Sequence, residues 1–109
     1  MITRIWQGWT SPENADVYEN LLKQEIFPGI QAMELDGLQG FELLRRPHGE
    51  EVEFMTVYRF ADVDSIRAMT GGTQSEAYVP QSAKAVLKRF ESTARHFELR
   101  HSHCCSRND

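Results

Sequence analysis

The strongest constraint on the fold is a strand-like alternation in which both faces are apolar. Residues 52–60 have the two-residue period of a β-strand and are rich in the β-branched and aromatic residues that strands favour. One face carries Val52, Phe54, Thr56, Tyr58 and Phe60, and the other carries Glu53, Met55, Val57 and Arg59. The solvent-facing side of an antiparallel sheet is normally polar, so we expect both sides of this strand to be at least partly covered.

Three further segments have strand character. In residues 2–9, Trp6 and Trp9 fall on opposite faces of a predicted strand. Residues 38–46 predict another, and the short turn at residues 47–50 favours a hairpin that joins it to residues 52–60. The last predicted strand spans residues 92–100, with His96 and Phe97 on opposite faces.

A long helical pattern follows the first strand. Ser11 is suited to cap a helix, Pro12 fits a first helical turn, and apolar residues then recur at helical spacing as far as Ile26. Pro28 is expected to kink or end this helix, which would extend about one turn further, to Leu35.

The second half of the chain repeats this order on a smaller scale. Asp62 predicts the cap of a short helix that stops at Gly71-Gly72, and residues 73–79 predict a loop. Pro80 predicts the start of another helix with Phe90 on its apolar face. The order strand–helix–strand, strand–helix–strand predicts an α+β, ferredoxin-like split βαβ fold with a four-stranded antiparallel sheet and helices on one face.

This architecture leaves the second face of the sheet without helices. The apolar groups that alternation places there would form a large exposed patch in a single chain. A second copy packed sheet against sheet would cover the patch, so we expect a homodimer. A monomer with a few exposed apolar groups is the alternative. We assign residues 1–100 to the domain and residues 101–109 to a flexible C-terminal tail.

Composition restricts the partners. Apolar residues make up 40% of the chain and charged residues 26%, as in ordinary globular domains, and the net charge is −4. An acidic chain with no basic stripe is poorly suited to nucleic acid or to anionic membranes. No apolar run is long enough to cross a bilayer, and the first residues do not have the pattern of a signal peptide. We therefore expect a cytoplasmic protein that binds neither nucleic acid nor membrane.

No motif with a specific chemistry is present. The sequence contains no glycine-rich phosphate loop, no Gly-x-Ser-x-Gly turn and no His-Glu-x-x-His. Its cysteines stand at the end, in the segment His101-x-His103-Cys104-Cys105, whose side chains can bind zinc but whose spacing matches no structural zinc pattern. We expect a frayed polar tail, with a weak metal site as the alternative, and we predict no metal and no cofactor.

Isolated polar residues within the apolar strands are the candidate catalytic groups. His96 can accept a proton near neutral pH, and Arg59 can hold an oxyanion or a carboxylate. Tyr58 and Tyr78 can donate hydrogen bonds to a ligand oxygen. The structural alternatives are a hydrogen bond within the sheet for His96, a surface ion pair for Arg59 and core packing for the tyrosines.

Aromatic residues supply the candidate pocket. Trp6 could form a flat wall of a substrate pocket, and Phe54 and Phe27 are the other pocket candidates. Each of these residues would also suit an ordinary hydrophobic core, which is the alternative.

Five segments carry a resemblance to a known family: ITRIWQGW (2–9), EIFPGI (25–30), GFELLRR (40–46), EVEFMT (51–56) and HFELR (96–100). Over about residues 1–100, the chain resembles the antibiotic biosynthesis monooxygenase family of dimeric α+β barrels. The resemblance implies a ferredoxin-like fold, a dimer made through the sheets, and a pocket between the sheet and the helices.

The resemblance also implies a function. Characterised members include cofactor-free oxygenases that oxidise phenolic polyketides to quinones, because the deprotonated substrate reacts with O₂ itself. We therefore expect a cofactor-independent monooxygenase-like protein acting on a small aromatic or polyphenolic substrate, or else a non-catalytic small-molecule-binding protein. Other members degrade haem and hold its iron through a histidine on the second helix. Residues 62–90 contain no histidine, which makes a haem-handling role less favoured.

Overall fold

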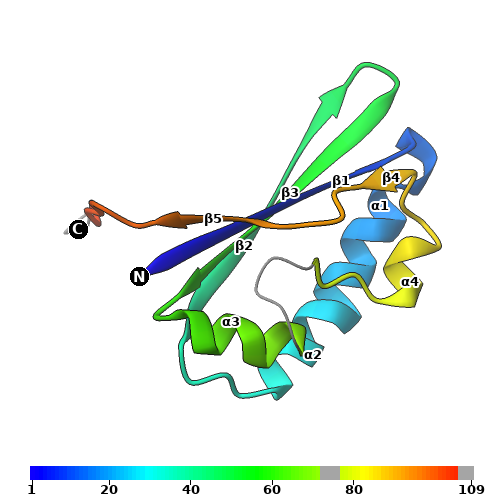
Figure 1. Cartoon of the computed structure of the whole chain (residues 1–109). Helices are drawn as coiled ribbons and strands as arrows, with labels where there is room; N and C mark the ends of the chain where they lie inside the picture. Colours follow the sequence, from blue (N-terminus) through cyan, green and yellow to red (C-terminus); the bar gives the residue numbers. More distant parts are fainter. Residues whose placement is uncertain (72–76, 106–109) are drawn as a thin grey trace.

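The computed structural model describes residues 1–71 and 77–105 (Figure 1). The elements, in chain order, are β1 (Ile2–Thr10), α1 (Pro12–Leu21), the π turn η1 (Leu22–Ile26), α2 (Phe27–Ala32), β2 (Leu38–His48), β3 (Glu51–Phe60), α3 (Val63–Thr70), α4 (Gln81–Lys84), β4 (Arg89–Phe90) and β5 (Arg95–Glu98). The predicted α+β, ferredoxin-like arrangement is confirmed.

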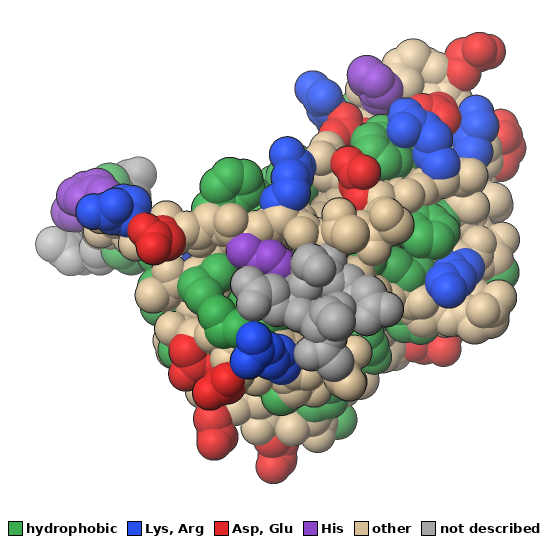
Figure 2. All heavy atoms as spheres, in the orientation of Figure 1, with side chains coloured by type: hydrophobic (Ala, Val, Ile, Leu, Met, Phe, Trp, Pro, Cys, Tyr) green, Lys and Arg blue, Asp and Glu red, His purple; other side chains and the backbone are tan. Residues whose placement is uncertain are grey.

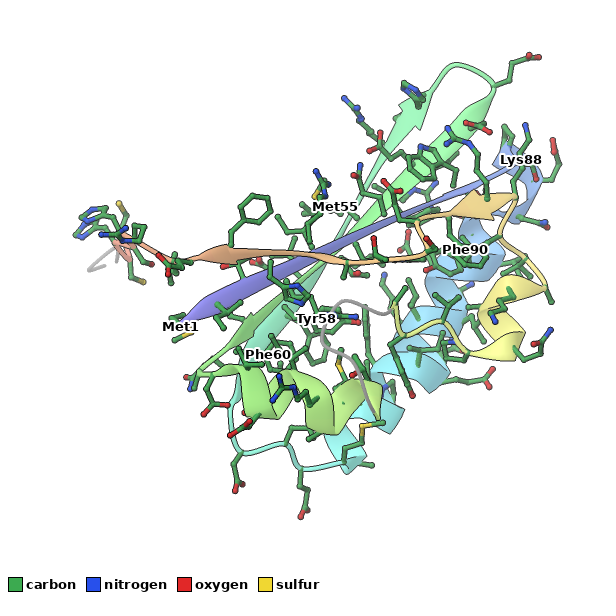
Figure 3. All side chains as sticks on the ribbon, in the orientation of Figure 1. Met1, Met55, Tyr58, Phe60, Lys88 and Phe90 are labelled. Carbon is green, nitrogen blue, oxygen red and sulfur yellow. The ribbon has the colours of Figure 1, made fainter. Side chains whose placement is uncertain are left out.

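The sheet is antiparallel and has the order β2-β3-β1-β4. β5 also pairs with β1, further along the same edge, so two short strands share the position that the sequence assigned to one. All the helices lie on one side of this sheet (Figure 1). Figure 3 shows the consequence for alternate residues of β3, because Tyr58 and Phe60 point toward the helices and Met55 points away from them.

The hydrophobic core fills the space between the sheet and the helices. Phe54 and Phe60 from β3 are fully buried there, as are Ile30 from α2 and Ile66 from α3. Tyr18 of α1 packs edge-on against Phe54, with 4.8 Å between the ring centroids. The face of β3 that carries the larger aromatic residues is therefore the one that packs against the helices.

The first helix continues past Pro28, as the predicted extension toward Leu35 requires, so of the two effects expected of this proline, a kink or an end, the end is not observed. α1 continues through η1 into α2, where Pro28 lies in the first turn. In η1 the N–H of Phe27 donates to the carbonyl of Leu22, five residues back. This wider turn accommodates Pro28, which has no N–H to donate. The helix ends at Ala32, one turn short of the predicted Leu35.

The helix predicted from Pro80 to Phe90 is also corrected. α4 ends at Lys84, and the following residues turn back to the sheet. The N–H of Lys88 donates to the carbonyl of Trp9 at 2.8 Å, and Phe90 pairs with Gly8. Pairing with the free edge of β1 therefore outweighs the helical periodicity of this segment.

The short helix α3 has the predicted ends. The carboxylate of Asp62 accepts from the N–H of Ser65 at 2.9 Å, and Gly71 closes the helix with a φ of 81°. The hairpin is tighter than predicted, since β2 extends to His48 and the turn contains Gly49 at a φ of 63°. The predicted loop at 73–79 lies mostly outside the described residues.

Two parts of the molecule project from the sheet and its helices. The end of the β2–β3 hairpin carries charged side chains of both signs (Figure 2). Residues 101–105 extend from β5, are exposed and belong to no helix or strand. The boundary at residue 100 and the flexibility of the tail remain predictions. None of the helices in the described ranges is long and apolar enough to span a membrane.

Candidate functional site

A small cavity lies between the sheet and the helices. Its volume is about 20 Å³, enough for one water molecule. The sheet contributes Arg4, Trp6, Thr56 and Tyr58 to its lining, and the opposite wall consists of Tyr18, Leu22, Ile26, Met69, Tyr78, Val79, Pro80 and Ala83. The cavity is therefore mainly apolar and aromatic, with a few polar groups, as ligand sites commonly are.

Arg4 is the charged residue of this lining. It follows the alternation of β1, whose even-numbered residues face the helices, and its side chain is only 1% exposed. Burial lowers the pKa of Arg4, and the nearby hydroxyl of Tyr58 opposes that effect. An arginine nevertheless keeps its proton in a folded protein, so the cavity has a permanently cationic donor in its wall.

His96 reaches the cavity through Arg4. The two residues are cross-strand partners of β1 and β5, and Nη1 of Arg4 lies 2.9 Å from Nε2 of His96. A guanidinium can only donate, so Nε2 of His96 accepts and the ring proton is on Nδ1. Burial lowers the pKa of His96, and the positive charge of Arg4 lowers it further. The imidazole is therefore neutral, and its Nε2 lone pair is engaged by Arg4.

The buried tyrosines act as donors. Burial raises the pKa of Tyr58 to about 12, although the charge of Arg4 acts in the opposite direction. Burial also raises the pKa of Tyr18, and the neighbouring Tyr58 raises it further. Both hydroxyls keep their protons at neutral pH. They are suited to hold a ligand oxygen and unsuited to remove a proton.

Trp6 forms a fixed wall of the cavity. Its Nε1 donates to the backbone carbonyl of Glu91 at 2.6 Å, and its ring lies 6.1 Å from that of Phe90. The end of the indole covers Gly8, where a Cβ atom would come within 2.9 Å of Trp6 Cη2. β4 and the residue that follows it therefore hold the indole in place.

Three of the predicted site residues lie elsewhere. Arg59 is on the sheet face opposite the helices, where its Nη1 lies 3.4 Å from Oε1 of Glu42. Phe54 and Phe27 belong to the hydrophobic core and do not line the cavity. The structure thus brings Trp6, Tyr58 and Tyr78 together at the cavity, with His96 behind Arg4.

Sequence reasoning missed Arg4, Tyr18 and Thr56. Arg4 shares the period of Trp6 and Gly8 in β1, and this alternation was the signal that could have placed a charged residue on the covered face. Tyr18 and Thr56 gave no such signal, because their types fit a core equally well. No group of three or more histidine, cysteine, aspartate or glutamate side chains within residues 1–71 and 77–105 is placed to hold a metal ion.

The open face of the sheet has its own polar feature, a row of four side chains that we term the polar ladder. It consists of Arg95, Gln7, Glu53 and Arg46, one each from β5, β1, β3 and β2. Arg95 donates to Gln7 at 2.6 Å, Gln7 donates to Glu53, and Arg46 donates to Glu53 at 2.8 Å. The ladder runs across the sheet and lines a shallow groove of about 460 Å³.

Comparisons with known proteins establish the fold only. No model of a protein family matches the sequence, and no curated protein matches it. Among solved structures, that of Rv0793 from Mycobacterium tuberculosis is similar, with a TM-score of 0.51 and 18% identity over 96% of this chain and 98% of that one. Two chains this different in sequence share an architecture, and their activities have to be argued from their own sites.

Proposed function

We propose that this chain is a cofactor-independent monooxygenase-like protein that acts on a small aromatic or polyphenolic substrate. The observation that carries the proposal is the cavity itself, an aromatic space whose wall contains a guanidinium and hydroxyl groups that can donate. The resemblance of the sequence to the antibiotic biosynthesis monooxygenase family agrees with it. Conversion of a ring CH₂ to a carbonyl consumes one O₂ and releases one water, so this reaction needs no external reductant.

The residues of the cavity have clear tasks in such a reaction. A phenol that loses its proton becomes an electron-rich anion, and O₂ attacks that anion directly. Arg4 and Tyr58 line the cavity, and their N–H and O–H groups would stabilise the negative oxygen, while the apolar walls exclude water. Access for an aromatic ring would require the cavity to widen, because the present space holds only one water, and we expect Tyr78, Val79 and Pro80 to be the part of its lining that moves. These three residues belong to no helix or strand.

The test is O₂ uptake with a panel of hydroxylated anthrones and hydroquinones, measured against spontaneous oxidation in buffer. Tyr58→Phe removes the hydroxyl and keeps the ring, and we expect it to lower kcat at least about tenfold, as loss of a donor to an oxyanion does. Arg59→Gln is the matched control, because Arg59 is on the other face and its loss should leave turnover unchanged. Substrates that bind without any uptake above buffer would refute the enzymatic proposal.

A non-catalytic binding protein is the second candidate, and one observation favours it. The imidazole nearest the cavity has its Nε2 engaged by Arg4, so that nitrogen is not free to act as a base. This candidate predicts saturable binding and a higher melting temperature with ligand, and no product.

We also propose that the protein is a cytoplasmic homodimer that associates through the open face of the sheet. That face carries apolar side chains beside the polar ladder: Ile5, Leu44, Met55, Val57 and Phe97. Leu44 is 51% exposed and Phe97 is 50% exposed in the single chain. Several apolar side chains left exposed on one face are typical of an interface.

Sedimentation analysis of Leu44→Glu tests this association. We expect the wild-type chain to sediment as a dimer and the variant as a monomer. Val17→Glu is the control, since Val17 is equally exposed, at 50%, but lies on α1. A wild-type monomer at high concentration, or a dimer unaffected by Leu44→Glu, would contradict the proposed interface.

A further inference from the structure

His96 combines three features that together suggest a role. It is the cross-strand partner of Arg4, it is partly exposed at the edge of the sheet, and its Nε2 faces the guanidinium at 2.9 Å. Arg4 itself is almost fully buried and lines the cavity. The imidazole is therefore placed to act on the arginine rather than directly on a bound molecule.

We propose that His96 is a positioning residue, whose neutral Nε2 accepts a hydrogen bond from Arg4 and holds the guanidinium against the cavity. The inference rests on the proposed ligand site, and it replaces the role of general base that the sequence suggests for this histidine. In this arrangement the ring carries its proton on Nδ1. The Nε2 lone pair is used by Arg4 and is not available to remove a proton from a ligand.

The need for such a residue follows from the arginine side chain. Arginine has several rotatable bonds, and in a strand next to the sheet edge it can turn its head toward solvent. A hydrogen bond that involves a charged group is stronger and shorter than a neutral one, so the acceptor at the edge restrains Nη1. The guanidinium then keeps a defined place in the cavity wall, which Tyr58 also lines.

Two substitutions of His96 can distinguish a positioning role from a role as a general base. A glutamine at position 96 would place its amide oxygen near the position of the imidazole Nε2 and could still accept from Arg4, but an amide cannot act as a base near neutral pH. A phenylalanine keeps the ring shape and removes the acceptor. A positioning role therefore predicts that glutamine substitutes for His96 and that phenylalanine does not.

The first measurement is the ring tautomer, from long-range ¹H–¹⁵N NMR correlations of the ¹⁵N-labelled full chain at a pH where the imidazoles are neutral. We expect His96 to be protonated on Nδ1 in the wild-type protein. In Arg4→Met we expect a mixture of the Nδ1- and Nε2-protonated tautomers. His48, which is exposed on the hairpin, is the reference in the same spectra and should not respond. An Nε2-protonated ring in the wild-type protein would overturn the proposal, even if Arg4→Met failed to fold.

The second measurement is binding of 4-nitrophenol, whose absorption also reports the ionisation state of the bound phenol. We expect His96→Gln to bind within about threefold of wild type and His96→Phe to bind at least about tenfold more weakly, as loss of a hydrogen bond to a charged group predicts. Equal losses in both variants, with both folded by thermal denaturation, would refute the positioning role. If no variant and no substrate gives O₂ uptake, the monooxygenase proposal fails while the tautomer result still decides the role of His96.

Discussion

The two faces of the sheet contain similar residue types and differ in what covers them. On the helix-covered face, Phe54 and Phe60 are fully buried and a charged residue, Arg4, is enclosed among aromatic rings. On the open face, Leu44 remains half exposed, Arg46 is hydrogen-bonded to Glu53, and Arg95 is hydrogen-bonded to Gln7 on the neighbouring strand. Alternation in the sequence thus determines which side chains share a face. Whether those side chains are buried depends on what packs against that face.

The largest expected difference concerns core volume. Phe54→Ala should lower the free energy of unfolding by about 3–5 kcal/mol at any protein concentration, because it opens a cavity against Tyr18. Leu44→Ala on the open face should change it by less than about 0.5 kcal/mol in dilute solution. Urea unfolding at two protein concentrations measures both. A large loss for Leu44→Ala in dilute solution would show that the two faces do not differ in this way.

A smaller effect is expected at Gly8, on the covered face. A Cβ there would meet Trp6 at 2.9 Å and Leu87 at 3.1 Å, and the indole is held by its bond to Glu91. Gly8→Ala should therefore cost about 1–3 kcal/mol by overpacking. Gly29→Ala is the matched control, because no atom lies within 4 Å of its Cβ position, and in a helix this change should gain about 0.5–1 kcal/mol. Thermal unfolding of the two variants should shift in opposite directions.

The smallest effect is the contribution of the polar ladder on the open face. The hydrogen bond from Arg46 lowers the pKa of Glu53 below its ordinary value, despite the opposing effect of burial. A carboxyl whose pKa is lower in the folded state than in the unfolded chain stabilises the fold above the unfolded pKa, and this stabilisation is lost as the pH falls through the folded pKa. We expect a contribution below about 1 kcal/mol, because Arg46 is largely exposed.

Unfolding of Glu53→Gln at pH 7 and pH 3 measures that contribution. The variant should be less stable than wild type at pH 7, and the difference should become smaller as the pH is lowered to 3. Glu42→Gln is the control on the same face, since Glu42 is 61% exposed and lies 3.4 Å from its partner Arg59. A difference that is as large at pH 3 as at pH 7 would mean that the carboxylate charge is not the cause.

Local signals predicted the local structure well. Asp62 and Gly71 delimit α3 as their capping chemistry indicates, and the alternation of β1 and β3 places their side chains on the expected faces. The helix predicted to reach Phe90 was wrong because its competitor, the edge of β1, lies some eighty residues away in the sequence. No periodicity within residues 80–90 contains that information.

The site was predictable only in part, for the same reason. Tyr58 and Trp6 were suggested by their own types, but the contact between Arg4 and His96 joins the two ends of the chain. A single histidine in a strand gives no indication of its partner. Only the pairing of β5 with β1 shows that this imidazole faces a guanidinium.

The π turn between α1 and α2 sets the angular positions of the buried residues around the helix axis. The buried positions along the helix are Ala15, Tyr18, Leu22, Ile26, Phe27 and Ile30. Four residues advance a regular α-helix by about 40° more than one full turn, so three successive steps of four would displace the last position by about 120° around the axis. The wide turn removes that drift and keeps Ile30 in phase with Tyr18.

Removal of any one of the exposed residues 23–25 would bring the same apolar side chains to the spacing of an ordinary amphipathic helix. The core therefore does not require one of the residues 23–25. The π turn can be described as a one-residue insertion that is accommodated within a single helical turn. Leu22 and Ile26 stand at the two ends of that turn and both line the cavity. A change of one residue in chain length is thus a route by which relatives of this fold could reshape the ligand space and leave the core intact.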